Sequence, residues 1–522
     1  MIGQDGVAEP TSARKGVSEL SKIKKVTLIE PQPPGYHVYS RVALPRLGLP
    51  ILGAMLKQKG IEVTIYCQDF EPIDYSDVLS SDLVGISTTT STAPEGYRIA
   101  DKAREAGIPV VMGGSHVSFL PDEALEHSDF CVRGEGEHVL PQLVDAIDSG
   151  SGFAGIKGLS YRIGDEIRHN PDAGFVKDLD ALPFADLSLI KGRDKVGITP
   201  IATSRGCPFD CSFCSVTKMF GRRYRERSIE SVVDEIERLN PKKLFFYDDN
   251  FTAHPSRTKE MLELMLSRGV VPKWTAQTRA DVVKDRELLK LMKRSNCYFL
   301  YIGFESVNPA TLEEYNKHQS PEEIAESVRI LHEHGILTHG MFVFGAENDD
   351  ADSLRSTMNF ALKNHIDTVQ FMILTPLPGT SYFTQMEQEG RLLTRDWHLY
   401  DGQHVVYQPN KMSPYELQKE TWKAMKRFYS LGECAKMVFG FDFLKFAAKL
   451  NANLLLGRWH SARRQLEARG LKWFYRAYGH FLIRRWEAAN EGVGERIKAL
   501  AEKASALRVQ KQSSPEKIEH NA

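Results

Sequence analysis

Three cysteines within eight residues form the densest group of reactive side chains in this 522-residue chain. Cys207, Cys211 and Cys214 lie in the segment SRGCPFDCSFC, and thiolates are soft ligands that suit zinc or iron–sulfur clusters. A structural zinc site needs a fourth ligand at comparable spacing, and an ordinary four-iron electron carrier uses four cysteines. No fourth cysteine is near, because Cys297 lies on a later apolar strand and is expected in the core. Three thiolates on a four-iron cluster would leave one iron open for a substrate or cofactor.

The composition excludes several other classes of protein. The chain has 67 Lys and Arg against 68 Asp and Glu, so no overall field favours nucleic acid. Seven cysteines, an odd number in a long chain, do not form a secreted disulfide framework and fit a reducing compartment. The N-terminus lacks the apolar core of a signal peptide, and no uncharged run approaches the ~20 residues of a membrane span. We therefore expect a cytoplasmic protein.

Alternating strand and helix patterns predict an α/β fold that begins with a doubly wound parallel sheet. Residues 1–22 read as a disordered arm, and residues 23–150 as the first, Rossmann-like domain. Its expected strands are residues 24–32, 61–66, 83–87, 109–112 and 130–132, with helices near 49–59 and 97–106. The loops after these strands are rich in Gly, Ser and Thr, and such sheets bind ligands at that edge.

A second alternation of strands and helices follows. Residues 151–194 are expected to form a small hairpin and a linker, and residues 195–410 six strand–helix units. Six such units predict a complete or partial parallel barrel of the TIM type, with its active site at the carboxyl ends of the strands. Residues 411–500 read as a helical region, and residues 501–522 as a solvated tail.

The cysteine spacing C-x3-C-x2-C after a predicted strand, with Phe213 before the last cysteine, resembles the radical S-adenosylmethionine (SAM) superfamily. The resemblance implies a [4Fe–4S] cluster on the three cysteines, with SAM chelated to the open iron. One electron, from a flavodoxin or ferredoxin, would then release a 5′-deoxyadenosyl radical.

In that family the polar ends of the barrel strands contact SAM. The second strand end would hold the SAM amino group and the fourth would contact its ribose. The resulting candidates are Phe213, Asp248, Asp249, Gln277, Arg279, Glu305 and Ser306. The acidic residues among them could instead cap the following helices, and Arg279 could form a structural ion pair with Asp281.

The N-terminal domain resembles, in the order and spacing of its motifs, the cobalamin-binding domain of class B radical SAM enzymes. The matching segments are LPRLG at 44–48, GGSH at 113–116 and RGEGE at 133–137. They make candidates of Arg46, Leu47, Ser87, Thr88, Thr89, Gly113, Gly114, Ser115, His116, Gly134 and Glu135. The chain lacks the Asp-x-His-x-x-Gly motif whose histidine ligates cobalt in many cobalamin domains. This absence leaves open a domain that has lost its cofactor.

Residues 439–486 combine many aromatic side chains with ten Lys and Arg, Arg476 among them, against two acidic residues. A basic, aromatic, amphipathic helix can lie on an anionic membrane surface. A helical cap that packs its apolar face on the barrel is favoured over this membrane contact, and a nucleic-acid contact is the least favoured of the three.

Together these patterns favour a cobalamin-dependent radical SAM C-methyltransferase that acts on an unactivated carbon of a small molecule, such as a lipid or isoprenoid. The segments SRGCPFDCSFC and TPLPGT also resemble anaerobic Mg-protoporphyrin monomethyl ester cyclases and hopanoid-associated enzymes. A radical oxidative cyclase of a tetrapyrrole or lipid is therefore the first alternative, and a cobalamin-binding sensor the second. No residue that acts on the substrate is identified, and the substrate stays open.

Overall fold

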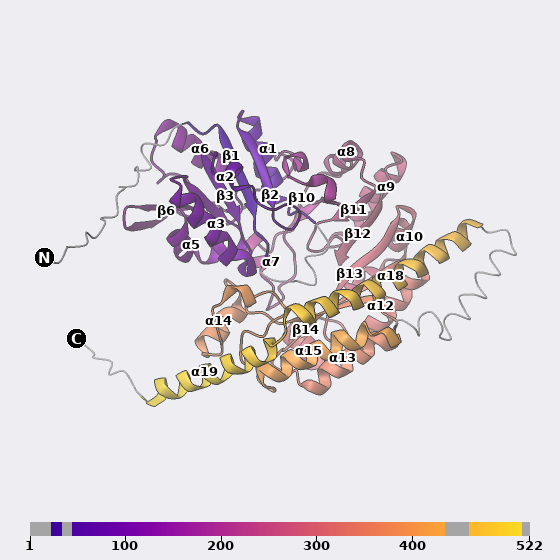
Figure 1. The fold of residues 1–522 in the computed structure, drawn as a ribbon. Coiled ribbons are helices and arrows are strands. Elements are labelled where there is room, and N and C mark those ends of the chain that lie inside the picture. Colours follow the sequence, from indigo (N-terminus) through magenta and orange to yellow (C-terminus); the bar gives the residue numbers. More distant parts are fainter. Residues whose placement is uncertain (1–21, 34–43, 434–458, 514–522) are drawn as a thin grey trace.

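The computed structural model describes residues 22–33, 44–433 and 459–513 of the chain (Figure 1). The expected N-terminal arm, up to residue 21, and residues 439–458 of the basic aromatic segment lie outside the described residues. An N-terminal α/β unit, an open parallel barrel and a group of C-terminal helices follow one another along the chain. Within the described ranges, no helix is both long and apolar enough to cross a membrane.

The N-terminal unit is built on a seven-stranded sheet with the order β2-β1-β3-β4-β5-β6-β7. Its strands are β1 (Lys25–Glu30), β2 (Glu62–Cys67), β3 (Leu83–Ser87), β4 (Val110–Gly113), β5 (Phe130–Val132), β6 (Leu159–Ile163) and β7 (Glu166–His169). The first five pair in parallel, as the sequence predicts. Nearly every residue of β1 is buried, as expected for a central strand covered by helices on both faces.

Helices cover both faces of this sheet (Figure 1). They are α1 (Gly48–Gln58), α2 (Tyr75–Val78), α3 (Ala93–Glu105), α4 (Ser115–Phe119), α5 (Pro121–His127) and α6 (Leu140–Ser149), with a short 3₁₀ turn, η3 (Thr90–Thr92). Two apolar clusters form the core of the unit. The parallel strands therefore present their carboxyl ends, and the loops that follow them, along one edge.

The hairpin predicted within the linker belongs to the first sheet. β6 pairs antiparallel with β5, and β7 with β6, so the sheet continues to His169, beyond the expected boundary at residue 150. The side chains of Leu159 and Tyr161 on β6 are buried in the N-terminal core, which explains why the hairpin docks there. Only the following segment, with the turns η4 (Leu187–Leu189) and η5 (Arg193–Lys195), connects the two units.

The second unit is a six-stranded parallel sheet with the linear order β15-β14-β13-β12-β11-β8, which makes it a partial barrel as expected. Its strands are β8 (Thr199–Ile201), β11 (Lys243–Phe246), β12 (Lys273–Thr278), β13 (Cys297–Glu305), β14 (Leu337–Phe344) and β15 (Thr368–Ile373). A separate antiparallel pair, β9 (Ser204–Arg205) and β10 (Arg225–Glu226), follows β8.

The barrel helices lie on the convex side of the sheet. They are α8 (Ile229–Leu239), α9 (Pro255–Ser267), η6 (Ala280–Lys284), α10 (Arg286–Arg294), α11 (Pro309–Glu314), α12 (Pro321–Glu333) and α13 (Ala351–Lys363). α7 (Val216–Phe220) precedes β10, and α14 (Ser381–Gln388) and η7 (Trp397–Leu399) follow β15. Cys297 is buried in the largest apolar cluster, which confirms it as a core residue.

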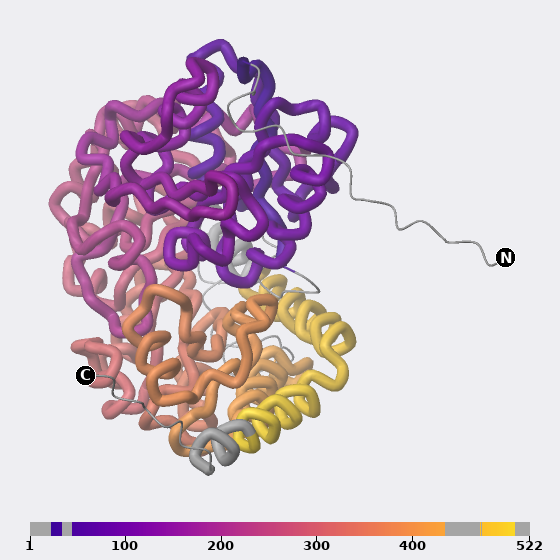
Figure 2. The backbone as a smooth tube through the Cα atoms, turned by 90° about the vertical axis from the view of Figure 1, so that its left-hand side faces the viewer, coloured from indigo at the N-terminus to yellow at the C-terminus, as the bar shows by residue number. Residues whose placement is uncertain are grey.

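Three helices complete the described chain: α15 (Pro414–Phe428), α18 (Trp459–Ala489) and α19 (Val493–Ser513). α18 and α19, yellow in Figure 2, lie along α15, and α18 also contacts β15. α19 continues to Ser513, so part of the region predicted as a solvated tail is helical.

Arg476 of α18 is buried rather than surface-exposed. Its guanidinium donates hydrogen bonds to the backbone carbonyls of Ile366 and Asp367, both at 2.8 Å, and of Phe428 at 2.6 Å. Lys472 forms an ion pair with Asp367 at 2.7 Å. This part of the basic segment is therefore a packed cap on the barrel, and Arg476 does not face a membrane.

We predict that Arg476→Met lowers the free energy of unfolding by about 2–4 kcal/mol, because three buried carbonyls lose their donor while the volume is nearly kept. Chemical denaturation measures the change. Arg496→Met, on an exposed position of α19, is the control. Equal stability of the two variants would contradict the assignment of Arg476 as a buried cap.

Candidate active site

The three cysteines lie on a loop that leaves the barrel through a narrow neck. β9 and β10 form this neck, with Arg205 opposite Arg225, and residues 206–224 between them carry the cysteines and α7. Gly206 has φ +86°, and a Cβ on it would lie 2.6 Å from the carbonyl oxygen of Arg223. The two ends of the loop approach each other so closely here that a side chain would clash. The first residue of the loop must therefore be a glycine.

The donor set fits an iron–sulfur cluster. The three thiols are half-buried, and burial raises the pKa of Cys207 and Cys211, and that of Cys214 to about 12. Cluster binding must therefore displace three protons. Across the described ranges, no three His, Cys, Asp or Glu converge closely enough for a single metal ion. In a four-iron cluster each of the three thiolates binds a different iron atom. The three cysteine sulfurs can therefore lie farther apart than the ligands of a single metal ion.

Contacts from distant parts of the barrel hold this cysteine loop. The ring of Phe213 packs edge-on against Tyr315, with centroids 4.8 Å apart. The hydroxyl of Ser381, at the start of α14, donates to the carbonyl of Ser212 at 3.1 Å. These contacts make Phe213 an anchor of the loop next to the cluster position.

Arg279 lies on the other side of the cysteine loop. Its guanidinium carbon is 3.9 Å from the ring centroid of Phe209, which favours a cation–π contact. Its Nε is also 3.9 Å from Asp281, beyond hydrogen-bond distance, and is buried without a hydrogen-bond partner among the described residues. Arg279 thus forms a long ion pair with Asp281, the structural alternative that the sequence left open, and its guanidinium lies beside the cysteine loop.

The two aspartates after β11 have different surroundings. Asp248 is buried, and its carboxylate accepts hydrogen bonds from the backbone and hydroxyl groups of Thr203 and Ser204 at 2.7–3.0 Å. Burial raises its pKa, and these hydrogen bonds oppose the rise. Asp248 thus joins the end of β11 to the start of the cysteine loop.

Asp249 instead opens to solvent at the carboxyl edge of the barrel. Desolvation by the surrounding protein, followed by the charge of Asp248, raises the pKa of Asp249 to about 7. Only the ionised form of this exposed carboxyl would accept hydrogen bonds from a cationic partner such as an amino group. Asp248 therefore supports the loop, and a contact of Asp249 with SAM remains a proposal.

The end of β13 is held by contacts within the protein. Glu305 has φ +62° and forms an ion pair with Lys317 at 2.9 Å, and a Cβ on Gly303 would lie 2.5 Å from its Oε1. Ser306 accepts a hydrogen bond from the backbone of Asn308 at 3.0 Å, just before α11. Lys317, which has no motif around it in the sequence, fixes the carboxylate of Glu305 at the edge.

The concave face of the barrel is lined by aromatic, apolar and neutral polar side chains. Along β14 buried and half-buried residues alternate, and the half-buried His339 lies beside Tyr301 of β13, with ring centroids 5.0 Å apart. Its nitrogens are 2.8 Å from Thr368 Oγ1 and 3.2 Å from Gln370 Oε1. Burial lowers the pKa of His339 to about 4, so this histidine is neutral at pH 7.

Gln277 is half-buried near the carboxyl end of β12. Its backbone carbonyl accepts a hydrogen bond from the amide of Phe251 at 2.9 Å, which joins the end of β12 to the loop after β11. Gln277 is therefore at the edge where SAM contacts are expected, and its binding role remains a proposal.

The glycine-rich loops of the N-terminal unit meet at the carboxyl edge of its sheet. Gly114 has φ +98°, and a Cβ on it would lie 2.3 Å from the carbonyl oxygen of Thr88. Ser118 donates to the carbonyl of Gly114 at 2.8 Å and accepts from the amide of Gly134 at 2.9 Å. Gly134 has open space around its missing side chain, so a bulky ligand can approach its backbone.

These loops fit a corrinoid. The hydroxyl of Thr88 is buried without a hydrogen-bond partner among the described residues. Ser87, Thr89, Gly113, Gly114 and Ser115 are only half-buried at the same edge. They would hold a bound cobalamin, together with Gly134, through backbone and hydroxyl groups.

His116 does not face this edge. Its side chain is buried, its Nε2 lies 3.0 Å from the hydroxyl of Tyr97 and 3.3 Å from Glu123, and its ring contacts Trp397 edge-on at 5.1 Å. Trp397, which follows the barrel, donates its Nε1 hydrogen to Glu123 at 2.8 Å. His116 therefore supports a contact between the two units through its Nε2 and its ring, whereas its Nδ1 is buried without a hydrogen-bond partner among the described residues.

Glu135 is likewise occupied by protein groups. Its carboxylate accepts two hydrogen bonds from Arg225, at 2.7 and 2.9 Å, one from Arg205 at 3.2 Å and one from the amide of Val176 at 2.6 Å. Burial alone would raise its pKa, but the hydrogen bonds from Arg225 and the charge of Arg205 hold it below the usual range. Glu135 joins the two units at the neck of the cysteine loop.

The carboxyl edges of the two sheets face each other. Arg46 forms an ion pair with Glu30 at the end of β1, at 3.1 Å, and Leu47 is buried in the N-terminal core. Tyr247, directly after β11 of the barrel, packs against the same core. The expected cobalamin loops and the expected SAM loops therefore border one interface.

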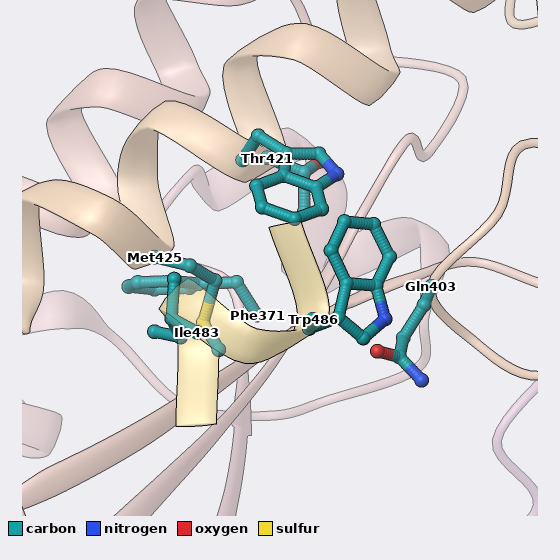
Figure 3. A pocket seen from close by; sticks show the side chains of 7 residues that line it. Phe371, Gln403, Thr421, Met425, Ile483 and Trp486 are labelled. Atoms are coloured by element: carbon teal, nitrogen blue, oxygen red, sulfur yellow. The ribbon is translucent and has the colours of Figure 1, made fainter. Parts of the chain in front are cut away.

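A small cavity of about 40 Å³ lies elsewhere, between β15, α15 and α18. Figure 3 shows its lining, which includes Phe371, Met425, Ile483 and Trp486. The side chain of Phe371 is buried on the face of β15 opposite Gln370, so this cavity is separate from the candidate active site. It has room for ordered water.

We predict that substitutions of the two aspartates after β11 affect different properties, the stability of the protein in one case and SAM binding in the other. Asp248→Asn should lower stability by about 2–4 kcal/mol, because an amide cannot accept the hydrogen bonds of both carboxylate oxygens. Asp249→Asn should leave the unfolding transition in place and weaken SAM binding, measured by calorimetry under anaerobic conditions.

For the wild-type protein the same measurement should show weaker SAM binding as the pH falls below about 7, where Asp249 becomes protonated. The Asp249→Asn variant should lose that dependence. Equal SAM affinity in the wild-type protein and this variant would contradict the assignment of Asp249.

Comparisons with known proteins agree with both parts of the site. Residues 201–360 match the radical SAM superfamily and residues 39–144 the B12-binding domain. Bacteriochlorophyllide d C-12(1)-methyltransferase of Chlorobaculum tepidum is 32% identical over 87% of this chain and 99% of its own. Hopanoid C-3 methylase of Methylococcus capsulatus is 27% identical, covering 78% and 80% of the two chains.

A cyclase and a solved structure are also similar to this chain. Anaerobic magnesium-protoporphyrin IX monomethyl ester cyclase of Cereibacter sphaeroides is 32% identical over 66% of this chain and 60% of its own. The cobalamin-dependent SAM radical enzyme OxsB shares the fold, with a TM-score of 0.63, 18% identity and coverage of 93% and 84%. With its three-cysteine loop and its B12-binding domain, the chain belongs to the radical SAM enzymes that carry an N-terminal B12-binding domain.

Proposed function

We propose that the chain is a cobalamin-dependent radical SAM methyltransferase that adds a methyl group to an unactivated carbon of an apolar small molecule. The observation that carries this proposal is the facing arrangement of the two carboxyl edges, where Tyr247 of the barrel packs against the N-terminal core. Methyl transfer from a corrinoid requires the substrate to lie between both cofactors, and enzymes accelerate such steps by holding the reactants in contact. A sensor would not need the three-cysteine loop at this interface.

The cofactors would supply the chemistry: a 5′-deoxyadenosyl radical to remove hydrogen from the substrate, and a methyl group from cobalamin. The residues of the chain would bind and orient these cofactors. Asp249 would accept hydrogen bonds from the SAM amino group, and Glu305, held by Lys317, would contact the ribose. Gln277, Arg279 and Ser306 remain proposed contacts to SAM.

An apolar substrate suits the concave face of the barrel. Phe299, Tyr301, Met341 and Met372 lie along its inner side, and the neutral His339 adds no charge there. A charged substrate would lose its hydration against this surface without a paired countercharge. The names of the relatives, a bacteriochlorophyllide methyltransferase and a hopanoid methylase, support a tetrapyrrole or a polycyclic lipid.

The test is an anaerobic reaction with SAM that carries a deuterated methyl group, methylcobalamin, a chemical reductant, and either tetrapyrroles or a sterol-like and hopanoid lipid extract. Mass spectrometry should detect a product that gains a labelled methyl group over successive turnovers. A product with a new ring or double bond and no label would contradict methyl transfer and favour the cyclase alternative.

The reaction also needs a one-electron donor, for which we propose a flavodoxin or ferredoxin. Lys218 of α7 and Arg223 are exposed on the loop that carries the cysteines. These donors are acidic proteins, so positive side chains close to the cluster position would favour their approach. The cytoplasmic location expected from the sequence fits such donors and remains a prediction.

We also propose that α18 contacts an anionic membrane, from which a lipid substrate would come. Trp473, Phe474 and Phe481 expose 49%, 53% and 52% of their surface, and Tyr478 lies between them on the helix. Arg484 and Arg485 are exposed on the next turn. Exposed aromatic rings bordered by arginine favour the interface of a negatively charged bilayer.

The double variant Phe474→Ser and Phe481→Ser should therefore bind less to vesicles that contain phosphatidylglycerol, measured by sedimentation. Ile163→Ser, which removes an equally exposed apolar side chain from the N-terminal unit, is the matched control and should bind like the wild-type protein. Equal binding of all three proteins, or no binding of the wild-type protein, would contradict the membrane contact.

A further inference from the structure

The neck of the cysteine loop is closed by two arginines that share one carboxylate from the other unit. Arg205 and Arg225 are register partners on β9 and β10, and both donate hydrogen bonds to Glu135. Arg205 lies two residues before Cys207, and Arg225 follows the end of the loop. One side chain of the N-terminal unit therefore holds both ends of the segment that carries the cluster ligands.

A second carboxylate strengthens this contact. Arg205 donates to Glu137 at 2.5 Å, and the side chains of Glu135 and Glu137 are only 2% and 5% exposed. Charges removed from water are stable only when paired, so each glutamate requires the barrel arginines and each arginine requires the glutamates. The planar guanidinium of Arg225 binds Glu135 through two hydrogen bonds, which fixes direction as well as distance.

The same loop borders the edge expected to bind cobalamin. Gly134 directly precedes Glu135, and its amide is held by Ser118, which also holds the carbonyl of Gly114. A displacement of Glu135 would therefore move the backbone that faces the corrinoid. The contact joins the two cofactor positions through one short segment of chain.

We propose that Glu135, with Arg205 and Arg225, is a positioning group that sets the separation and orientation of the corrinoid and the iron–sulfur cluster. This inference rests on the proposed function, because it assumes that both cofactors bind. The group touches neither the substrate nor the reacting atoms. It acts by fixing the cysteine loop against the glycine-rich loop. Loss of the group should therefore change the distance between the two cofactors while both cofactors stay bound.

The experiment measures that geometry directly in the protein loaded with both cofactors. With cobalamin as cob(II)alamin and the cluster reduced, both centres are paramagnetic, and pulsed electron paramagnetic resonance reports the dipolar coupling between them. The wild-type protein should give one narrow distance distribution. Glu135→Gln, which keeps the shape but removes the charge, should broaden that distribution and shift it to longer distance while iron and corrinoid contents stay unchanged.

Two further variants separate positioning from a general loss of stability. Glu235→Gln breaks an ion pair with Arg227 at 2.5 Å that is equally buried but lies within the barrel, so the distribution should stay narrow. Arg225→Lys keeps the charge but not the paired hydrogen bonds, so it should broaden the distribution less than Glu135→Gln does. It also provides the measurement if Glu135→Gln does not fold.

An unchanged distribution in both Glu135→Gln and Arg225→Lys would overturn the positioning role and leave the proposed function intact. Equal broadening in Glu235→Gln would also overturn it, because the effect would then be general. A wild-type protein that binds the cluster but no corrinoid would overturn the proposed function, and the positioning role with it.

Discussion

The buried carboxylate of Glu135 between two arginines of the barrel is the contact on which the arrangement of the site depends. Its hydrogen bonds bridge 70 and 90 positions of sequence and leave the side chain 2% exposed. Because an unpaired buried charge is costly, the N-terminal unit and the neck of the cysteine loop stabilise each other only in one relative position. The facing carboxyl edges of the two sheets follow from that constraint.

The chain after the barrel closes the same interface from another direction. Trp397 donates to Glu123, and the ring of Phe119 packs so closely on Gly379 that a Cβ there would lie 2.3 Å from it. Ser381, two residues later, holds the cysteine loop. The TPLPGT segment thus contacts the N-terminal unit through Gly379, and the residue that follows it, Ser381, contacts the cluster loop.

The sequence predicted most of the elements, because strand periodicity is a local property, and the cysteine spacing that makes Cys207, Cys211 and Cys214 the proposed cluster ligands is local as well. The structure revises the expected roles of residues whose contacts are with residues far away in the sequence. Glu135 and His116 lie in glycine-rich motifs that indicate ligand binding, yet their partners, Arg225 and Trp397, lie in the second unit. The membership of the hairpin β6–β7 in the first sheet and the carbonyl partners of Arg476 could not be predicted for the same reason, since neither has a local pattern.

In the proposed arrangement, one chain holds a cluster and a corrinoid on facing edges. Its most direct test is anaerobic purification with cobalamin supplied during expression, followed by iron, sulfide and corrinoid assays and a UV–visible spectrum. We expect about four irons and about one corrinoid per chain, as one [4Fe–4S] cluster and one cobalamin require. Iron and sulfide at that level without corrinoid would contradict this arrangement, because the N-terminal edge would then bind some other ligand.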